Sequence, residues 1–146
     1  MKTKRYLYII ALGLLFFISS CKTYYIPVNS FKQQFSGWKT TILREVTTQG
    51  PFGDIAKYNT YPIDFVKCVD KNGNPAVLAN SPALEIRFID INNKKTTFYF
   101  DRISVNDTIV SGVQSRILSS ITKTIHLNTI KLIEIQDGRK RYKYVQ

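Results

Sequence analysis

Few residues of this chain belong to the types that carry out chemistry in proteins. The 146 residues include two cysteines, Cys21 and Cys68, and one histidine, His126. A metal centre normally needs more ligands of these types, so the sequence predicts neither a metal site nor a cofactor. No serine or cysteine stands in a recognisable nucleophile motif, and no glycine-rich phosphate loop is present. The chemistry that can be predicted therefore depends on the setting of Cys21.

Cys21 follows a segment with the three parts of a secretory signal peptide. Three cations lie within the first five residues, an uncharged and mostly apolar run of 13 residues covers 6–18, and two serines come last. A membrane-spanning helix needs about 20 apolar residues. The segment is therefore predicted to be an export signal over residues 1–20 and not a permanent span.

The sequence Ile18-Ser19-Ser20-Cys21 resembles the lipobox of bacterial lipoproteins. In that family, cleavage occurs just before the cysteine, whose sulfur receives a diacylglyceryl group. The resemblance implies that residues 1–20 are removed and that Cys21 carries acyl chains such as palmitate. The three chains usual in the family exceed the two signals that stable anchoring requires. An ordinary signal peptide that contains a cysteine, or an uncleaved N-terminal anchor, are the alternatives.

The residues after Cys21 bear on the location of the anchor. No acidic tract follows the cysteine, because the first carboxylate is Glu45, and Lys22 stands where an aspartate is associated with inner-membrane retention. The resemblance therefore implies an outer-membrane lipoprotein that faces the periplasm. Residues 21–29 are expected to form the lipidated cysteine and a tether, in which Pro27 excludes a regular helix. Residues 30–146 are expected to form a single domain.

The chain is strongly basic. Removal of residues 1–20 would lower its formal net charge from +11 to +8, because three cations and no anions are lost. A basic surface attracts phosphate-rich and acidic partners. Export would exclude nucleic acid, which leaves the membrane lipid, an envelope protein or an anionic cell-envelope polymer as predicted partners.

The candidate contacts to such an anionic surface are concentrated near the C-terminus. They are Arg139, Lys140, Arg141 and Lys143, and tyrosines at positions 142 and 144 interleave with them. One interpretation is binding to a phosphate-bearing surface. The alternative is an edge strand whose positive charge prevents edge-to-edge aggregation.

Hydrophobic periodicity predicts a mainly β domain with one short N-terminal helix. The helix is expected over 30–37, where Phe31 and Phe35 are spaced i,i+4 after a capping-box pattern. Residues 22–29 and 76–82 are expected to lack regular structure. Strands are expected over 38–47, 61–69, 83–90, 96–105, 108–113, 121–127, 130–136 and 139–145.

The strands after residue 82 are expected to form one contiguous antiparallel sheet, curled into a small barrel or roll. Asp137-Gly138 is a typical two-residue hairpin turn and is expected to join the last two strands. The predicted core residues are Leu84, Ile86, Phe88, Phe98, Phe100, Ile133 and Ile135. The segments EIRFIDINN, FYFDRISVNDTIVSG, KTIHLNTIKLIEI and QDGRKRYKYV together resemble small uncharacterised bacterial lipoproteins and SH3-like or Sm-like barrels.

The sequence therefore predicts a membrane-anchored lipoprotein that acts as a non-enzymatic binding or accessory module in the cell envelope. The competing hypothesis is a small hydrolase that acts on cell-wall or surface glycans, because a pair of carboxylates that meet only in space cannot be read from a sequence. His126 and Cys68 are expected to be an exposed strand residue and a buried, inert thiol.

Overall fold

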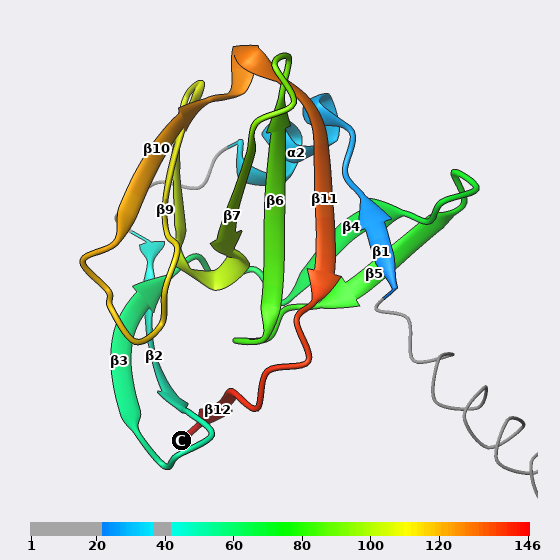
Figure 1. Ribbon diagram of the computed structural model, residues 1–146. Coiled ribbons are helices and arrows are strands. Elements are labelled where there is room, and N and C mark those ends of the chain that lie inside the picture. The colour runs from blue at the N-terminus through cyan, green and yellow to red at the C-terminus, as the bar shows by residue number, and fades with distance from the viewer. Residues whose placement is uncertain (1–21, 37–41) are drawn as a thin grey trace, which may run out of the picture.

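A computed structural model describes residues 22–36 and 42–146 of the chain (Figure 1). The described part is mainly β, as predicted, with antiparallel sheets and one α-helix. The elements are β1 Thr23–Tyr25, α2 Val28–Phe35, β2 Arg44–Gln49, β3 Ile55–Thr60, β4 Phe65–Val69, β5 Pro75–Ala79, β6 Leu84–Asp90, β7 Lys95–Tyr99, β8 Ile103–Asn106, β9 Ile109–Val113, β10 Thr122–His126, β11 Ile130–Asp137 and β12 Lys143–Val145, with short 3-10 helices at Phe100–Arg102 and Leu127–Thr129.

The largest sheet has six strands in the order β5-β4-β1-β11-β6-β7. Its inner strand β1 pairs with β11 on one side, where Thr23 faces Gln136, and with β4 on the other. The prediction of a tether over residues 22–29 is therefore wrong, because the three residues Thr23–Tyr25 complete the sheet and α2 begins at Val28. The segment is too short to signal a strand by periodicity, and its long-range partners decide its structure.

Two further sheets have three strands each, in the orders β10-β9-β8 and β12-β2-β3. The residues after 82 are thus divided among all three sheets and do not form the one contiguous sheet that we predicted. In the described part of the chain the sheets do not close into a barrel either. The strand predicted over 96–105 is interrupted by the 3-10 helix at Phe100–Arg102, and this break lets the chain leave β7 for the separate sheet that starts with β8.

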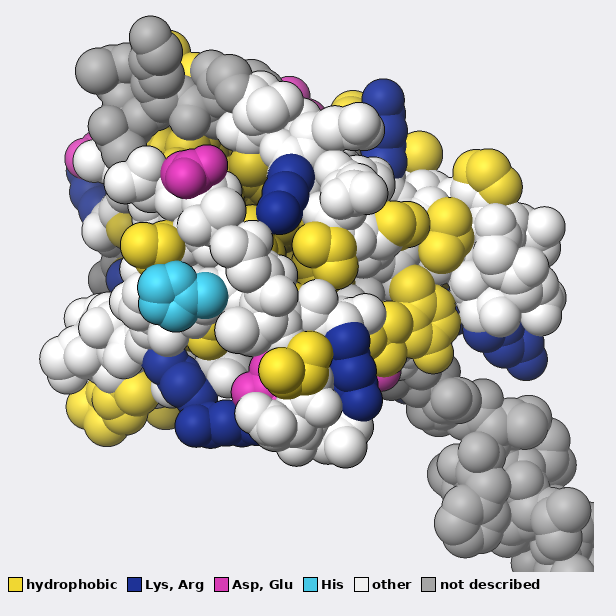
Figure 2. Space-filling view, turned by 90° about the horizontal axis from the view of Figure 1, so that it is seen from above, with side chains coloured by type: hydrophobic (Ala, Val, Ile, Leu, Met, Phe, Trp, Pro, Cys, Tyr) yellow, Lys and Arg dark blue, Asp and Glu magenta, His cyan; other side chains and the backbone are white. Residues whose placement is uncertain are grey.

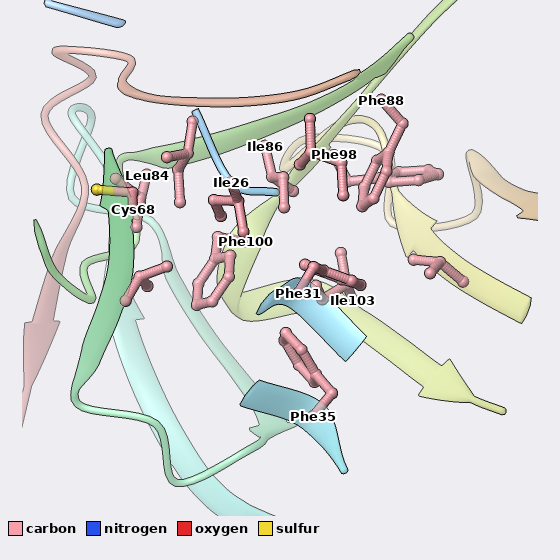
Figure 3. Close-up of a cluster of buried hydrophobic side chains, with 14 of the residues drawn as sticks. Ile26, Phe31, Phe35, Cys68, Leu84, Ile86, Phe88, Phe98, Phe100 and Ile103 are labelled. Atoms are coloured by element: carbon pink, nitrogen blue, oxygen red, sulfur yellow. The ribbon is translucent and has the colours of Figure 1, made fainter. Parts of the chain in front are cut away.

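The hydrophobic core lies between the large sheet and α2 (Figure 3). All seven predicted core residues are buried, which confirms the alternation read from the sequence. Helix α2 begins two residues earlier than predicted, at Val28, and its first residues use no side-chain cap. Phe31 and Phe35 nevertheless face the core as expected, with ring centroids 4.7 Å apart. The Phe31 ring meets the edge of Phe88 on β6, which fixes the helix on the sheet.

The predicted hairpin at Asp137-Gly138 is wrong. Strand β11 already has β1 on one edge and β6 on the other, so no edge remains for the chain that follows. Residues 138–142 instead lead away to β12, which pairs with β2. Gly138 is needed for another reason: a Cβ there would lie 3.0 Å from the Ala83 carbonyl oxygen, to which the Gly138 N–H donates a hydrogen bond.

The positions of the shorter turns agree better with the prediction. The turns predicted at 50–53 and 92–93 lie between consecutive antiparallel strands, and the turn predicted at 106–107 is shifted by one residue, because Asn106 still pairs with Ile109 at the end of β8. Residues 75–79, which we expected in a loop, form β5 after a turn that the Asp70 side chain closes by accepting two backbone hydrogen bonds. No helix within the described residues has the length and apolar character that crossing a bilayer requires. The predicted export signal, Cys21 and the start of the strand predicted over 38–47 lie outside the described residues.

Candidate functional site

The most unusual feature of the described structure is a buried ion pair between Asp101 and Arg116. Asp101 lies in the 3-10 helix after β7, and Arg116 lies in the loop between β9 and β10. The Arg116 Nη2 atom is 2.6 Å from Asp101 Oδ1, and the two side chains are 4% and 0% exposed. Charges are rarely buried unless they are paired and hydrogen-bonded, so this pair needs further partners.

Tyrosine hydroxyls supply partners for the carboxylate. The Tyr144 hydroxyl donates to Asp101 Oδ2 over 3.1 Å, and the Tyr58 hydroxyl makes a second short hydrogen bond to the same oxygen. Tyr58 comes from β3 and Tyr144 from β12, so the buried carboxylate links the end of the large sheet to both strands. We call Tyr58, Tyr99, Tyr142 and Tyr144 the tyrosine cluster.

Arg116 lies among the same rings. Its guanidinium carbon is 4.2 Å from the centre of the Tyr99 ring and 5.2 Å from that of Tyr142. It donates to the Tyr58 hydroxyl over 3.1 Å and also to the Pro82 carbonyl. Its Nε atom is buried and has no hydrogen-bond partner among the described residues. One donor of this guanidinium therefore remains to be satisfied.

The electrostatic setting keeps the phenols protonated. Burial, together with the nearby Asp101 carboxylate, raises the pKa of Tyr58 to about 12. Burial and Asp101 also raise the pKa of Tyr144. Burial by itself would lower the pKa of Arg116, but Asp101 and Tyr58 more than offset this effect and the pKa is raised. Neither phenol is thus poised as a general base near neutral pH, where a catalytic pKa would have to lie.

A surface cleft of about 550 Å³ opens beside Arg116. We call it the Arg116 cleft; it is lined by Phe52, Asp54, Ile55, Ala56, Lys57, Arg102, Arg116, Ile117, Ser119 and Tyr142. Phe52 and Ile55 belong to the hairpin of β2 and β3, while Ile117 belongs to the loop between β9 and β10. Phe52 is 93% exposed and Ile117 is 84% exposed. Large apolar side chains exposed on both walls of a cleft are typical of an interaction site.

The charges of the cleft favour an acidic ligand. Arg116 is neutralised by Asp101 behind it, and Lys57 lies 4.0 Å from the Glu45 carboxylate on β2, which leaves Arg102 as the main cation of the cleft beside Asp54. Arg102 lies over the Tyr58 ring, 4.3 Å from its centre, so the tyrosine cluster holds this cation at the mouth of the cleft. The arrangement can bind a ligand that carries both apolar and acidic groups.

The basic residues predicted from the sequence separate into two groups. Tyr142 and Tyr144 point inward to Arg116 and Asp101, so Lys143 between them points outward. Lys143 and Arg141, which precedes Tyr142, are both exposed. Strand β12 is an edge strand, as one of our two interpretations required, but it covers only Lys143–Val145.

Lys140 differs from its neighbours. Its Nζ atom is 2.6 Å from Glu85 and donates to the Tyr99 hydroxyl over 2.8 Å. Lys140 is exposed, as we had expected, but it lies in the connection before β12 and not on the edge strand itself. Arg139 is exposed at a left-handed position, with φ of 51°, and takes part in further interactions.

The other candidates lie where the sequence placed them. Cys68 is buried, and burial raises the pKa of its thiol. His126 is exposed at the end of β10, where it is the cyan side chain in Figure 2. No cluster of three or more metal-binding side chains occurs among the described residues.

Sequence reasoning missed the centre of the site. Asp101 and Arg116 are 15 residues apart, in segments that no local motif connects. The alternation of tyrosines and cations after residue 138 was visible, but what the tyrosines contact depends on the packing of three sheets. The sequence offered one signal: Asp101 directly follows three aromatic residues, Phe98 to Phe100.

Comparison of the chain with protein family models, with curated proteins and with solved structures gave no match.

Proposed function

We propose that this chain is a bacterial lipoprotein, anchored through Cys21 in the outer membrane and facing the periplasm. The support is the order of cations, apolar run, serines and cysteine in residues 1–21, and its resemblance to a lipobox. The absence of an acidic tract after Cys21 supports the periplasmic side. On this proposal the domain works as a non-enzymatic binding module of the cell envelope.

The observation that carries the binding role is the Arg116 cleft. Phe52 and Ile117, from two separate chain segments, expose apolar surface in this cleft, which is costly in water unless a partner covers it. Arg102 adds positive charge at the same place, whereas Lys57, which also lines the cleft, is paired with Glu45. The buried ion pair and the tyrosine cluster hold these walls in position, because they join β3, β12 and the loop that carries Ile117.

The chemistry of the cleft favours a protein segment as its ligand. An anionic polymer would use the cations but would leave the apolar walls uncovered. A segment that places aliphatic or aromatic side chains between Phe52 and Ile117, and a carboxylate at Arg102, satisfies both features. The proposed partner is therefore an envelope protein with an exposed acidic and apolar segment.

The competing hydrolase hypothesis gains no support from this geometry. A glycosidase of the usual kind needs two carboxyl groups on either side of the bond to be cleaved. Among the described residues that line the Arg116 cleft, Asp54 is the one carboxylate. Asp101 lies behind it, fully buried and paired with Arg116.

Site-specific photocrosslinking in cells tests the binding role. A photoreactive phenylalanine analogue replaces Ile117 in the cleft or, as a control, Val77, which is 62% exposed on β5. We expect one discrete adduct from position 117 and none from position 77. Adding Arg102→Glu should reduce that adduct at least tenfold, whereas Lys95→Glu, which makes the same charge change at an exposed position of β7, should leave it unchanged. Equal adducts at both positions, or an adduct that Arg102→Glu does not affect, would contradict the proposal.

A further inference from the structure

The folded domain begins almost immediately after Cys21. Thr23 is already hydrogen-bonded in the large sheet, where it faces Gln136 and its hydroxyl contacts the Gln136 side chain. Lys22 is the one residue between Cys21 and Thr23. It lies over the Tyr24 ring and close enough to Asp70 to add to the lowering of that carboxyl's pKa, which hydrogen bonds from Asn74 chiefly cause. The chain between Cys21 and the sheet is therefore neither long nor loose.

Covalent geometry sets the distance from the anchor to the sheet. Two residues of fully extended chain span at most about 7 Å. The polar layer on each side of a bilayer is about 5 to 7 Å thick. If the acyl chains on Cys21 occupy the hydrocarbon, Thr23 lies within the polar layer or at its surface. The end of the large sheet that contains Thr23, Gln136 and the start of β6 must then touch the headgroups.

The same end carries the basic segment, which we define as residues 138–143. Gln136 pairs with Thr23, which lies two residues after Cys21. The basic segment begins two residues after Gln136. From there it runs along the lower edge of the molecule to β2, as the red part of the chain in Figure 1 shows. Arg141 and Lys143 are exposed beside a surface hollow of about 420 Å³ against the turn that contains Gly50 and Pro51.

The charge at this end is predominantly positive. Lys22, Arg141 and Lys143 are exposed. Of the carboxylates at this end, Glu85 is paired with Lys140, and Asp70 and Asp137 accept backbone hydrogen bonds. Cations held within a few ångströms of a membrane surface bind anionic lipids, and the effect vanishes beyond the screening length of about 8 Å. The short connection to Cys21 keeps Lys22 inside that range, and the basic segment reaches it when the end of the sheet that carries this segment rests on the bilayer.

We infer that the anchored domain rests directly on the bilayer with this end of the sheet downward, and that Lys22, Arg141 and Lys143 bind the phosphate groups of anionic lipids. The inference rests on the proposed lipidation of Cys21. The anchor and the basic segment together fix the orientation of the domain, so the Arg116 cleft on the neighbouring hairpin is held at a defined height above the membrane. The opposite end of the sheet carries the turn between β6 and β7, where Lys94 and Lys95 are exposed and face away from the bilayer.

Lysine footprinting of the lipidated, full mature protein tests this orientation. The protein is reconstituted into phosphatidylcholine vesicles with or without one third phosphatidylglycerol (roughly the anionic content at which surface charge acts strongly). A membrane-impermeant acylating reagent then labels exposed lysines, and mass spectrometry compares Lys143 with Lys94 in the same molecules. This internal ratio cancels differences in how many molecules face outward.

We expect phosphatidylglycerol to reduce the labelling of Lys143 at least fivefold relative to Lys94, and high salt to restore it. The variant Arg141→Glu should restore most of the Lys143 labelling in anionic vesicles. The matched variant Lys95→Glu, which makes the same charge change at the far end, should not. Equal labelling of Lys143 and Lys94 in vesicles that do carry the protein would overturn the orientation and leave the anchor intact. Failure of the protein to float with any vesicle would instead refute the lipidation itself.

Discussion

Removal of the Arg116 charge is the sharpest test of the structure around the candidate site. The substitution Arg116→Met keeps much of the side-chain volume but leaves Asp101 as a carboxylate that is 0% exposed. Breaking a buried ion pair by removing one partner costs about 3–5 kcal/mol. The hydroxyls of Tyr58 and Tyr144 still donate to Asp101, which places the expected loss at the lower end, about 3 kcal/mol.

Urea unfolding of residues 22–146, followed by far-ultraviolet circular dichroism, measures this loss. The double variant Asp101→Asn with Arg116→Met removes both charges and should lose less than the sum of the two single variants, by about 2 kcal/mol or more. Strictly additive losses, or a loss for Arg116→Met below about 1 kcal/mol, would refute the buried ion pair.

Three other expectations concern stability. Phe100→Ala should destabilise the domain by about 3–5 kcal/mol in urea unfolding, because Phe100 is 4% exposed in the core, and a loss below about 1 kcal/mol would contradict its burial. Gly138→Ala should cost about 1–3 kcal/mol, because the new Cβ would meet the Ala83 carbonyl and the Glu85 side chain; an unchanged midpoint would argue against that close approach. Tyr58 should ionise late, near pH 12 rather than 10, as measured by phenolate absorbance. Since the folded state retains this proton, stability should fall by roughly 2 kcal/mol as the pH rises from about 10 to 12, and should be unaffected by this group below that range.

The sequence predicted the core better than the connections. Period-two alternation identified Leu84, Ile86 and Phe88 as buried, because only one register of a strand puts all three on the same face. The same reasoning could not show which strands pair. Thr23–Tyr25 are only three residues, and their place between β4 and β11 depends on residues more than 40 and 100 positions away.

That one misplaced segment explains the missing hairpin, whereas the 3-10 helix at Phe100–Arg102 explains the separate sheet of β8, β9 and β10. Once β1 occupies one edge of β11, Asp137-Gly138 cannot form a hairpin, and the chain must carry the basic segment to β2. The barrel expected from residues 83–145 then becomes parts of three sheets. The tyrosine cluster forms where these sheets meet, which is why its ion pair could not be anticipated from local patterns.

The proposed anchor is the claim on which the orientation of the domain depends, and fatty-acid labelling in bacterial cells tests it most directly. Cys21 and Cys68 are the only two cysteines, so each serves as the control for the other. We expect the wild-type protein and Cys68→Ala to incorporate labelled palmitate and to stay in the membrane fraction after a high-salt wash. Cys21→Ala should incorporate none and should move to the soluble periplasmic fraction. Label on Cys21→Ala, or a wild-type protein without label, would contradict the account.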